Sequence, residues 1–565
     1  MKQSLYMAGD TVIVNLSSRF YNFAEEIVSS DGFAVFLERY FKELAVRDIR
    51  VYSWLTNGRP LEETVPALTD LIRQLLISQE RPEGMSELDC MKSIYIVEDC
   101  YRYWRSHKRF TVVSGNRAEA LAENFGEYDE KYSSLISQLY RSCLRKLSGR
   151  SEKVIRRTAG GTNGSCLLMK YRIALPRGYA SLRNIPFVAR MLLKTPLMMD
   201  FDDAGEQLRP ISLASNPLSS CRMDPRDYFC LPLKVCDFLC LTYFHKDYLA
   251  QACCLANLFE LADESDCLQQ RAHLICLFGL PAESHQLGYY HDEKNGIHLA
   301  AVCRNYREES FISIRNVILM LHDLAQLQRG QLPVHGSLVE IFFRDESRKS
   351  LLLIGETGAG KSETVEALRS LSDEIRNDKT VRRLEVVFDG VGSLKTVEGR
   401  VVACGSETGG FERMSDLGQS VVRDVENGIF INLQKKDAMV ILPFSSYETI
   451  RGDHGIDMVL YANNYENAVG VERLESYEEF RSCLTEGKRM IRDPQGREML
   501  VSSSPMNFGL NASQKERYLE IMDSVFTRLY ENGVFAGQLY TNLANGRREK
   551  LQESARCLWE LLRQQ

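Results

Sequence analysis

The sequence lacks an excess of positive charge. Its 565 residues include 70 Lys and Arg against 76 Asp and Glu, which gives a formal net charge of -6. Proteins that bind nucleic acid usually carry a basic stripe or patch. The near balance of charge therefore argues against nucleic acid as a partner, and we expect none.

Long apolar runs are also missing, and the first apolar stretch lacks the pattern of a secretory leader. No run approaches the roughly 18 uncharged apolar residues that a transmembrane helix needs, so we expect no membrane span. Asp10 interrupts the first apolar stretch, and no small-residue cleavage site follows it. We therefore expect no signal peptide.

Cysteine pairs with C-x-x-C spacing are absent as well. None of the 16 cysteines forms a C-x-x-C pair, which argues against a zinc site or a thioredoxin-like centre. So many unpaired cysteines are typical of a reducing compartment, and we expect a cytoplasmic protein. On a single strand, Cys230, Cys236 and Cys240 would share one face. They would then form either a soft-metal or redox site or a packed face of small apolar side chains.

The length predicts several domains, because one domain holds roughly 100–200 residues. Apolar residues spaced three and four apart predict a mainly helical module over residues 1–150. Residues 148–165 are basic and then Gly-rich, which predicts a linker, with a phosphate loop as the alternative. Residues 151–330 predict an α/β domain for substrate binding or regulation, ending in a helix that stops at Gly330. Residues 331–565 form the third unit, and the whole chain is expected to be α/β, mixed α+β overall.

The strongest motif begins at Gly355, where GETGAGKS satisfies G-x-x-x-x-G-K-[ST]. An apolar run leads into it and a helical pattern, VEALRSL, leads out, and this strand, loop and helix order is what the motif requires. A Gly-rich turn capped by Ser is the structural alternative. We predict that the loop binds a nucleotide through Gly355, Glu356, Thr357, Gly358, Ala359, Gly360, Lys361, Ser362 and Glu363.

The physical basis of this prediction is direct. Glycines let the backbone wrap a phosphate with several N–H groups turned inward. The N-terminus of the following helix adds a partial positive charge. Lys361 is expected to reach the β- and γ-phosphates, and the Ser362 hydroxyl is expected to bind Mg²⁺, which prefers hard oxygen ligands.

Two further residues are predicted to serve the loop. Asp389 lies where the apolar run LEVVFDG is expected to end, and it is predicted to bind the metal or to act as a base. The alternative is a turn, since Asp-Gly is a common turn pair. His335 precedes the first strand of the unit and could bind Mn²⁺ as a neutral imidazole, whereas a single His is more often structural. The predicted catalytic set is Lys361, Asp389 and His335, and the predicted metal set is Ser362, Asp389 and His335.

These residues together resemble the superfamily that joins phosphoenolpyruvate carboxykinases to HPr kinase/phosphorylase. GETGAGKSET, including Glu363, is similar to the HPr kinase P-loop, and HGSLVEI resembles the strand before it. Over about 310–565, the segments ETGGFERM, DHGIDMVLYANNYENA and RLYENGVFAGQLYTNLANG also resemble parts of the carboxykinases. The resemblance implies a carboxykinase-like P-loop domain with a mixed sheet. The corresponding His of the carboxykinases binds a catalytic Mn²⁺, which implies a metal role for His335.

The sequence departs from the family pattern at several positions. Arg315 or Asn316 falls where the carboxykinases have a metal-binding Lys, and Asp389 stands alone where they have paired aspartates. Met439 falls near the place of an Arg that assists phosphoryl transfer, and the Arg-Ser-Pro segment that binds oxaloacetate is not found. The resemblance thus implies nucleotide binding more than oxaloacetate chemistry.

We therefore expect an ATP-dependent phosphotransferase that moves the γ-phosphate to a small hydroxyl compound or a protein. ATP and Mg²⁺ are the expected cofactors, with Mn²⁺ as the alternative metal. A catalytically degenerate ATP-binding sensor and a divergent phosphoenolpyruvate carboxykinase are the two alternatives. The oligomeric state stays open, because HPr kinases form hexamers and carboxykinases are often monomers.

Overall fold

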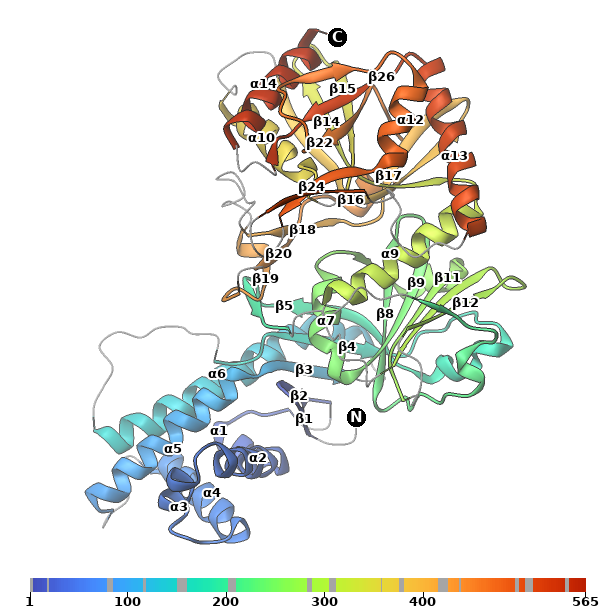
Figure 1. Ribbon diagram of the computed structural model, residues 1–565. Helices are drawn as coiled ribbons and strands as arrows, with labels where there is room; N and C mark the ends of the chain where they lie inside the picture. The colour runs from blue at the N-terminus through green and yellow to red at the C-terminus, as the bar shows by residue number, and fades with distance from the viewer. Residues whose placement is uncertain are drawn as a thin grey trace.

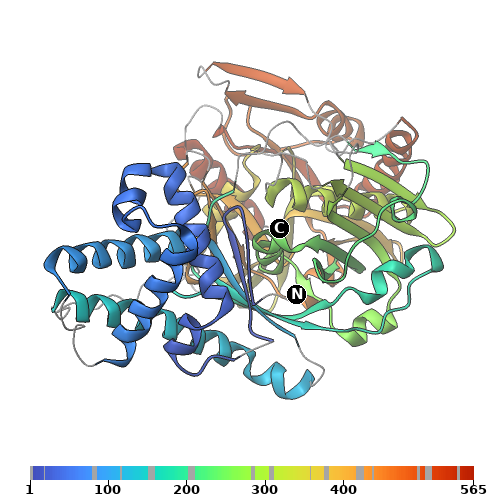
Figure 2. The same ribbon diagram turned by 90° about the horizontal axis from the view of Figure 1, so that it is seen from below.

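A computed structural model shows a mixed α/β fold with several sheets, which confirms the expected class (Figures 1 and 2). Within the described part of the chain, no helix is both long and apolar enough to cross a membrane. The segment 148–165, expected to be a linker, lies mostly outside this part. The described residues are 4–17, 20–78, 85–114, 118–149, 160–201, 210–281, 287–303, 311–356, 358–374, 381–414, 425–435, 438–492, 497–502, 512–543 and 548–564.

The largest sheet has twelve strands in the described residues and joins the first two predicted units. Its path runs β1-β2-β3-β4-β5-β8-β9-β11-β13-β12-β7, and β10 pairs with β8. The parallel pairing of β3 with β4, where Phe110 lies opposite Gly164, crosses the expected boundary at 150. The strands are β1 (Leu5–Ala8), β2 (Thr11–Asn15), β3 (Lys108–Ser114), β4 (Gly164–Met169), β5 (Phe187–Leu193), β7 (Ile211–Ser212), β8 (Tyr228–Val235), β9 (Phe238–His245), β10 (Glu260–Leu261), β11 (Ala272–Leu280), β12 (Leu287–Asp292) and β13 (Ile297–Cys303).

The first 150 residues contain the expected helices in addition to strands β1, β2 and β3. Figure 2 shows the helices gathered at one end of the sheet. Ser side chains cap several of them: Ser30 accepts a hydrogen bond from Phe33 N, and Ser86 accepts one from Asp89 N. The helices are α1 (Ala24–Val28), α2 (Asp31–Arg47), α3 (Ile49–Thr56), α4 (Leu61–Ile77), α5 (Glu87–Ser106) and α6 (Ala118–Ser148).

A buried carboxylate fixes α6 to the sheet. Asp129 is fully buried, and its Oδ1 accepts hydrogen bonds from the hydroxyls of Thr111 (2.6 Å) and Thr162 (2.5 Å). Its Oδ2 forms an ion pair with Lys194. A charge taken out of water needs such partners, because the uncompensated ion would cost several kcal/mol.

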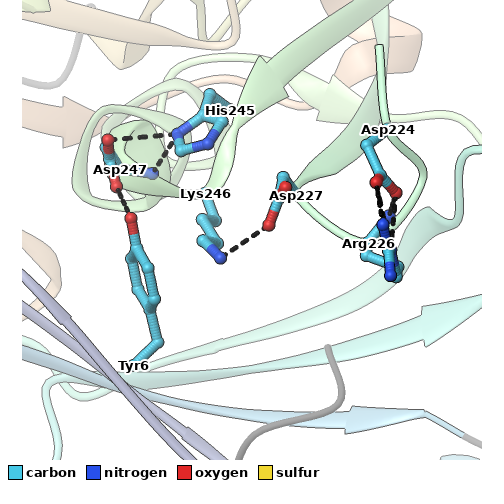
Figure 3. Close-up of polar contacts among 7 residues, drawn as sticks. All are labelled: Tyr6, Asp224, Arg226, Asp227, His245, Lys246 and Asp247. Carbon is cyan, nitrogen blue, oxygen red and sulfur yellow. Dashed lines mark hydrogen bonds and ion pairs between the residues drawn. The ribbon is translucent and has the colours of Figure 1, made fainter.

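A polar latch ties β1 to the segment after β9 (Figure 3). The Tyr6 hydroxyl donates to Asp247 Oδ1 at 2.5 Å. Lys246 Nζ lies 3.7 Å from the centre of the Tyr6 ring and pairs with Asp227 Oδ1 at 2.6 Å. The ring of His245 contacts the same Asp247 carboxylate, at 3.1 Å. Because Tyr6 contacts both Lys246 and Asp247, this group of residues joins the N-terminal hairpin to the middle of the chain.

The cysteines expected on one strand belong to a hairpin instead. Val235, the last residue of β8, pairs with Phe238, the first of β9. Cys236 lies in the intervening turn with a left-handed φ of 53°. The single-strand prediction was therefore wrong, because the apolar sequence on both sides hides the turn.

A long buried helix, α9 (Phe311–Gln328), lies between the twelve-stranded sheet and the C-terminal unit (Figure 1). Its predicted extent is confirmed, and Gly330 follows it with a left-handed φ of 74°. Two short helices, α7 (Leu249–Ala256) and α8 (Glu264–Gln269), belong to the same middle region.

The C-terminal unit is built on an eight-stranded mixed sheet of order β21-β17-β16-β14-β15-β22-β26-β23. Its strands are β14 (Leu332–Phe343), β15 (Arg348–Ile354), β16 (Val381–Val397), β17 (Arg400–Gly405), β21 (His454–Gly455), β22 (Met458–Asn463), β23 (Val471–Arg473) and β26 (Phe535–Tyr540). The helices of this unit are α10 (Lys361–Glu374), α11 (Tyr447–Arg451), α12 (Tyr477–Glu486), α13 (Ala512–Glu531) and α14 (Arg548–Gln564).

Two smaller sheets complete the unit. β24 (Lys488–Arg492) pairs with β25 (Glu498–Ser502). The other has the order β18-β20-β19-β6, and β6 comes from the middle of the chain, so this sheet joins the two regions. Its strands are β18 (Gly409–Arg413), β20 (Met439–Pro443), β19 (Ile429–Ile431) and β6 (Leu197–Met199).

Replacing the buried carboxylate tests its role in fixing α6. We expect Asp129→Ala to lower the free energy of unfolding by about 3 kcal/mol, because Lys194 and two hydroxyls lose their shared acceptor. Urea unfolding followed by circular dichroism measures the change. The control Asp70→Ala removes an exposed ion pair with Arg73 and should cost less than about 0.5 kcal/mol. Equal losses in the two variants would contradict this role.

Candidate functional site

The glycine-rich loop joins the end of β15 to the start of α10, and β15 lies between β14 and β22 in the eight-stranded sheet. β15 is antiparallel to β14 and parallel to β22, and its last residues are buried. Leu351, Leu352 and Leu353 are fully buried, which anchors the strand by apolar contact on both faces. The loop then leads directly into α10, whose first residue is Lys361. The predicted strand, loop and helix order is confirmed.

Two glycines of the loop have left-handed backbones. Gly358 has a φ of 79° and Gly360 a φ of 102°. A Cβ on Gly360 would lie 2.6 Å from Thr541 Cβ, whereas a Cβ on Gly358 would meet nothing within 4 Å. Gly360 is thus required by close packing as well as by conformation.

Neighbouring strand ends hold the loop by its carbonyls. Asn464, just after β22, donates from Nδ2 to Gly358 O at 3.0 Å and to Met490 O at 3.1 Å. Thr541, just after β26, donates from Oγ1 to Ala359 O at 2.7 Å. These contacts use carbonyl oxygens of the loop, whereas the N–H group of Ala359 donates to Glu356 O at 3.0 Å.

Lys361 folds back over the loop that precedes it. Its Nζ donates to Gly355 O at 2.8 Å and to Glu356 O at 3.0 Å, and the residue is 5% exposed. Burial lowers the pKa of the ammonium, and the negative charges of Asp389, Glu363 and Glu356 oppose that shift. The ammonium group of Lys361 is therefore buried beside the loop, with two carbonyl oxygens as its partners. An anion could replace these carbonyls.

The register of β14 places three polar side chains on one face of the sheet. Ser337 lies opposite Asp389 of β16, and its hydroxyl donates to Asp389 Oδ1. His335 lies two residues before Ser337, so both have the same orientation along the strand. The backbone N–H of Gly355 donates to His335 O at 3.3 Å, which places this face directly beside the loop.

The expected strand end at Asp389 was wrong. β16 continues through this residue to Val397, and its ladder to β14 shifts register near Val386. Gly390 and Gly392 follow Asp389 within the strand and leave room where side chains would clash. Asp389 is thus a mid-strand residue facing Ser337, and the Asp-Gly turn that was the alternative does not form.

Positive charge surrounds the half-buried His335. Burial is the largest cause that lowers its pKa well below the usual value, followed by the charges of Lys361, Arg315 and Arg489. A neutral imidazole has a lone pair for a metal or a hydrogen-bond donor. His335 therefore has the protonation state that a metal ligand requires.

A buried ion pair covers the site from the side of α9. Arg315 donates from Nε to Glu407 Oε1 at 2.6 Å and from Nη2 to Oε2 at 2.5 Å, a bidentate contact. A Cβ on Gly390 would lie 3.1 Å from Glu407 and 3.2 Å from Arg315. Burial raises the pKa of Glu407, and the Arg315 guanidinium opposes that rise. The pair thus lies against the backbone next to Asp389 and joins α9 to the C-terminal unit.

Glu412 on β18 adds a further carboxyl to the site. Burial raises its pKa to about 8, and the charges of Asp389, Glu366 and Glu363 add to the rise while Arg369 opposes it. Sequence reasoning missed this residue and the Arg315–Glu407 pair. The segment ETGGFERM contained the signal, because its two glutamates flank the glycines that carry the resemblance.

The structure brings most of the predicted site residues together. Lys361, Asp389 and His335 interact electrostatically at one end of the sheet, and Ser362 is half-buried in the first turn of α10. Thr357 lies outside the described residues. In the part of the chain that is described, no group of three or more His, Cys, Asp or Glu side chains is arranged to hold a metal ion.

A scan against models of protein families finds no match for this chain, and a search of curated proteins finds none either. The chemistry of the site therefore has to be argued from its own residues.

The two left-handed glycines permit a matched test of the loop. We expect Gly360→Ala to lower the free energy of unfolding by about 2 kcal/mol more than Gly358→Ala, because only the first also creates a clash. Urea denaturation of both variants measures the difference. If both variants lose the same stability, the close approach of Thr541 does not constrain the loop.

Proposed function

We propose that this protein is an ATP-dependent phosphotransferase of the carboxykinase and HPr kinase-like class, acting in the cytoplasm. The observation that carries the proposal is the braced glycine-rich loop with a buried lysine, next to the sheet face of His335, Ser337 and Asp389. The acceptor is a hydroxyl group of a small molecule or of a protein. Phosphoryl transfer depends mainly on positioning and charge neutralisation, which this arrangement of residues supplies.

The donor set fits a nucleotide with a hard divalent cation. The N-terminus of α10 leaves its first N–H groups without helical partners, as an anion site requires. Lys361 exchanges its carbonyl partners for β- and γ-phosphate oxygens. Ser362 and Asp389 would hold Mg²⁺, which commonly uses one or two protein ligands together with phosphate and water. The metal, when bound, neutralises charge on the phosphates, and His335 would serve a second ion such as Mn²⁺.

Two carboxyl groups are placed to take the proton of the acceptor hydroxyl. Asp389 acts on Lys361 through its charge and is held by Ser337. Glu412 has a pKa of about 8, close to the working pH at which a general base is most effective. We assign the metal to Asp389 and the proton to Glu412, since a metal ligand is less available as a base.

Removal of the loop lysine tests nucleotide binding. We expect Lys361→Ala to weaken binding of Mg-ATP by at least about a hundredfold, because the contact to the phosphates is a charge-assisted one in a buried setting. Titration with a fluorescent ATP analogue measures this. Lys349→Ala, on β15 outside the loop, is the control and should bind normally. Normal binding by the Lys361 variant would overturn the proposal.

The assignment of Glu412 predicts a pH dependence of transfer from labelled ATP to acceptors in a cell extract. The carboxylate form is the base, so the rate should rise with pH and level off above about 8. In Glu412→Gln this rise should disappear and the rate should fall by about 10²–10⁴-fold. A wild-type rate that does not change between about pH 6.5 and about pH 9 contradicts the assignment, and so does a variant that keeps the rise.

A nucleotide-binding regulatory protein is the second candidate. It is favoured by the Arg315–Glu407 pair, because this internal contact occupies the place of a metal-binding residue in the resemblance and connects the site to α9. Bound ATP would then bias the docking of the two regions without being consumed. Transfer that depends on Lys361 excludes this candidate, whereas Mg-ATP binding without any transfer or hydrolysis favours it. A divergent carboxykinase is the third reading, and it requires bicarbonate fixation with phosphoenolpyruvate, ADP and Mn²⁺.

A further inference from the structure

The N-terminal helices line a partly open cavity of about 100 Å³ that lies far along the chain from the loop site. Its wall includes Leu5 and Val14 of the β1–β2 hairpin and side chains from α1, α2, α4, α5 and α6. An engineered apolar cavity of about 150 Å³ stays dry and binds benzene. The present cavity is of comparable size, and its occupant is therefore of the order of one six-membered ring.

Three polar side chains of the wall have partners within the protein. Tyr140 donates to Glu98 at 3.0 Å, Trp104 Nε1 donates to Gly160 O at 2.8 Å, and Ser30 donates to Ile27 O at 2.6 Å. Burial raises the pKa of the Cys143 thiol to about 12, which keeps that side chain uncharged. A polar or charged occupant would lose its water shell with little in return, so an apolar one is favoured.

Rigid aromatic contacts keep the cavity open. The rings of Tyr101 and Tyr140 stack with centroids 3.7 Å apart, and Phe36 meets Trp104 edge to face at 5.9 Å. A void in a core persists when its lining cannot collapse into it. On α5, Ile96 and Trp104 are buried whereas Cys100 and Tyr101 are half-buried, so solvent reaches the cavity past the second pair.

We propose that this cavity is a binding site for a small uncharged apolar molecule, such as a single aromatic ring or a short branched hydrocarbon. The proposal is independent of the phosphotransferase assignment, since none of the residues that line the cavity belongs to the loop site. The size, the mainly apolar lining and the internal pairing of Tyr140, Trp104 and Ser30 are the three observations that support it.

Fluorobenzene and benzylammonium are suitable probes, because they share the ring and differ in charge. Titration of the full chain, followed by ¹⁹F nuclear magnetic resonance for the first and by thermal unfolding for both, should show saturable binding of fluorobenzene. Benzylammonium should bind at least about tenfold more weakly, because its charge finds no partner in the cavity. Absence of saturable fluorobenzene binding, or equal binding of both probes, overturns the proposal.

Variants that fill the cavity locate the binding. Cys143→Phe should weaken fluorobenzene binding at least about tenfold by occupying the same space. Cys557→Phe, at an exposed position on α14, is the matched control and should bind as the wild type does. Ile136→Phe, from another position of the wall, is the second filling variant. Circular dichroism checks that each variant folds. Undiminished binding by a folded filling variant overturns the proposal, and if neither filling variant folds, the comparison of the two probes on the wild type decides.

Discussion

The pairing of β14 with its two neighbours is the constraint on which the site depends. On one side β14 pairs with β15, which delivers the loop, and on the other it pairs with β16, which carries Asp389. Since side chains alternate along a strand, a slip of β14 by one residue would turn His335 and Ser337 to the face opposite Asp389. The buried apolar residues of β14 and β15 make such a slip costly. The hydrophobic core therefore sets the register of β14, and this register determines which side chains lie together beside the loop.

Burial of charge is the second theme of the molecule. Asp129 in the N-terminal region and the Arg315–Glu407 pair beside the site are both removed from solvent, and both are held by several contacts. Such pairs add little net stability, but breaking one leaves an uncompensated charge. They act as specific connections between elements: α6 to the sheet in one case, and α9 to the segment between β17 and β18 in the other. Helix α9 is thus fastened on both sides, by apolar packing along its length and by this ion pair.

The sequence patterns correctly predicted elements that depend on residues close together in the chain. The motif at Gly355 and the helix ending before Gly330 each depend on residues close in sequence, and each is found. The pairing of β3 with β4, the contact of Arg315 with Glu407 and the burial of Glu412 depend on residues far apart, and no spacing rule contains them. Asp389 shows the limit most clearly. The Asp-Gly pair favoured a turn, but cross-strand pairing with Ser337 outweighs that local preference.

The position of Lys361 connects the fold to the proposed chemistry. A buried ammonium group is costly unless its hydrogen bonds are made, and here the carbonyls of Gly355 and Glu356 make them. Neutral carbonyls compensate a full charge less well than anions do, and the lowered pKa of Lys361 reflects that shortfall. A phosphate oxygen at the same place would remove it. Under the proposed function, an anionic phosphate oxygen would therefore be a better partner for Lys361 than the two neutral carbonyls are, and glycine content alone does not supply this preference.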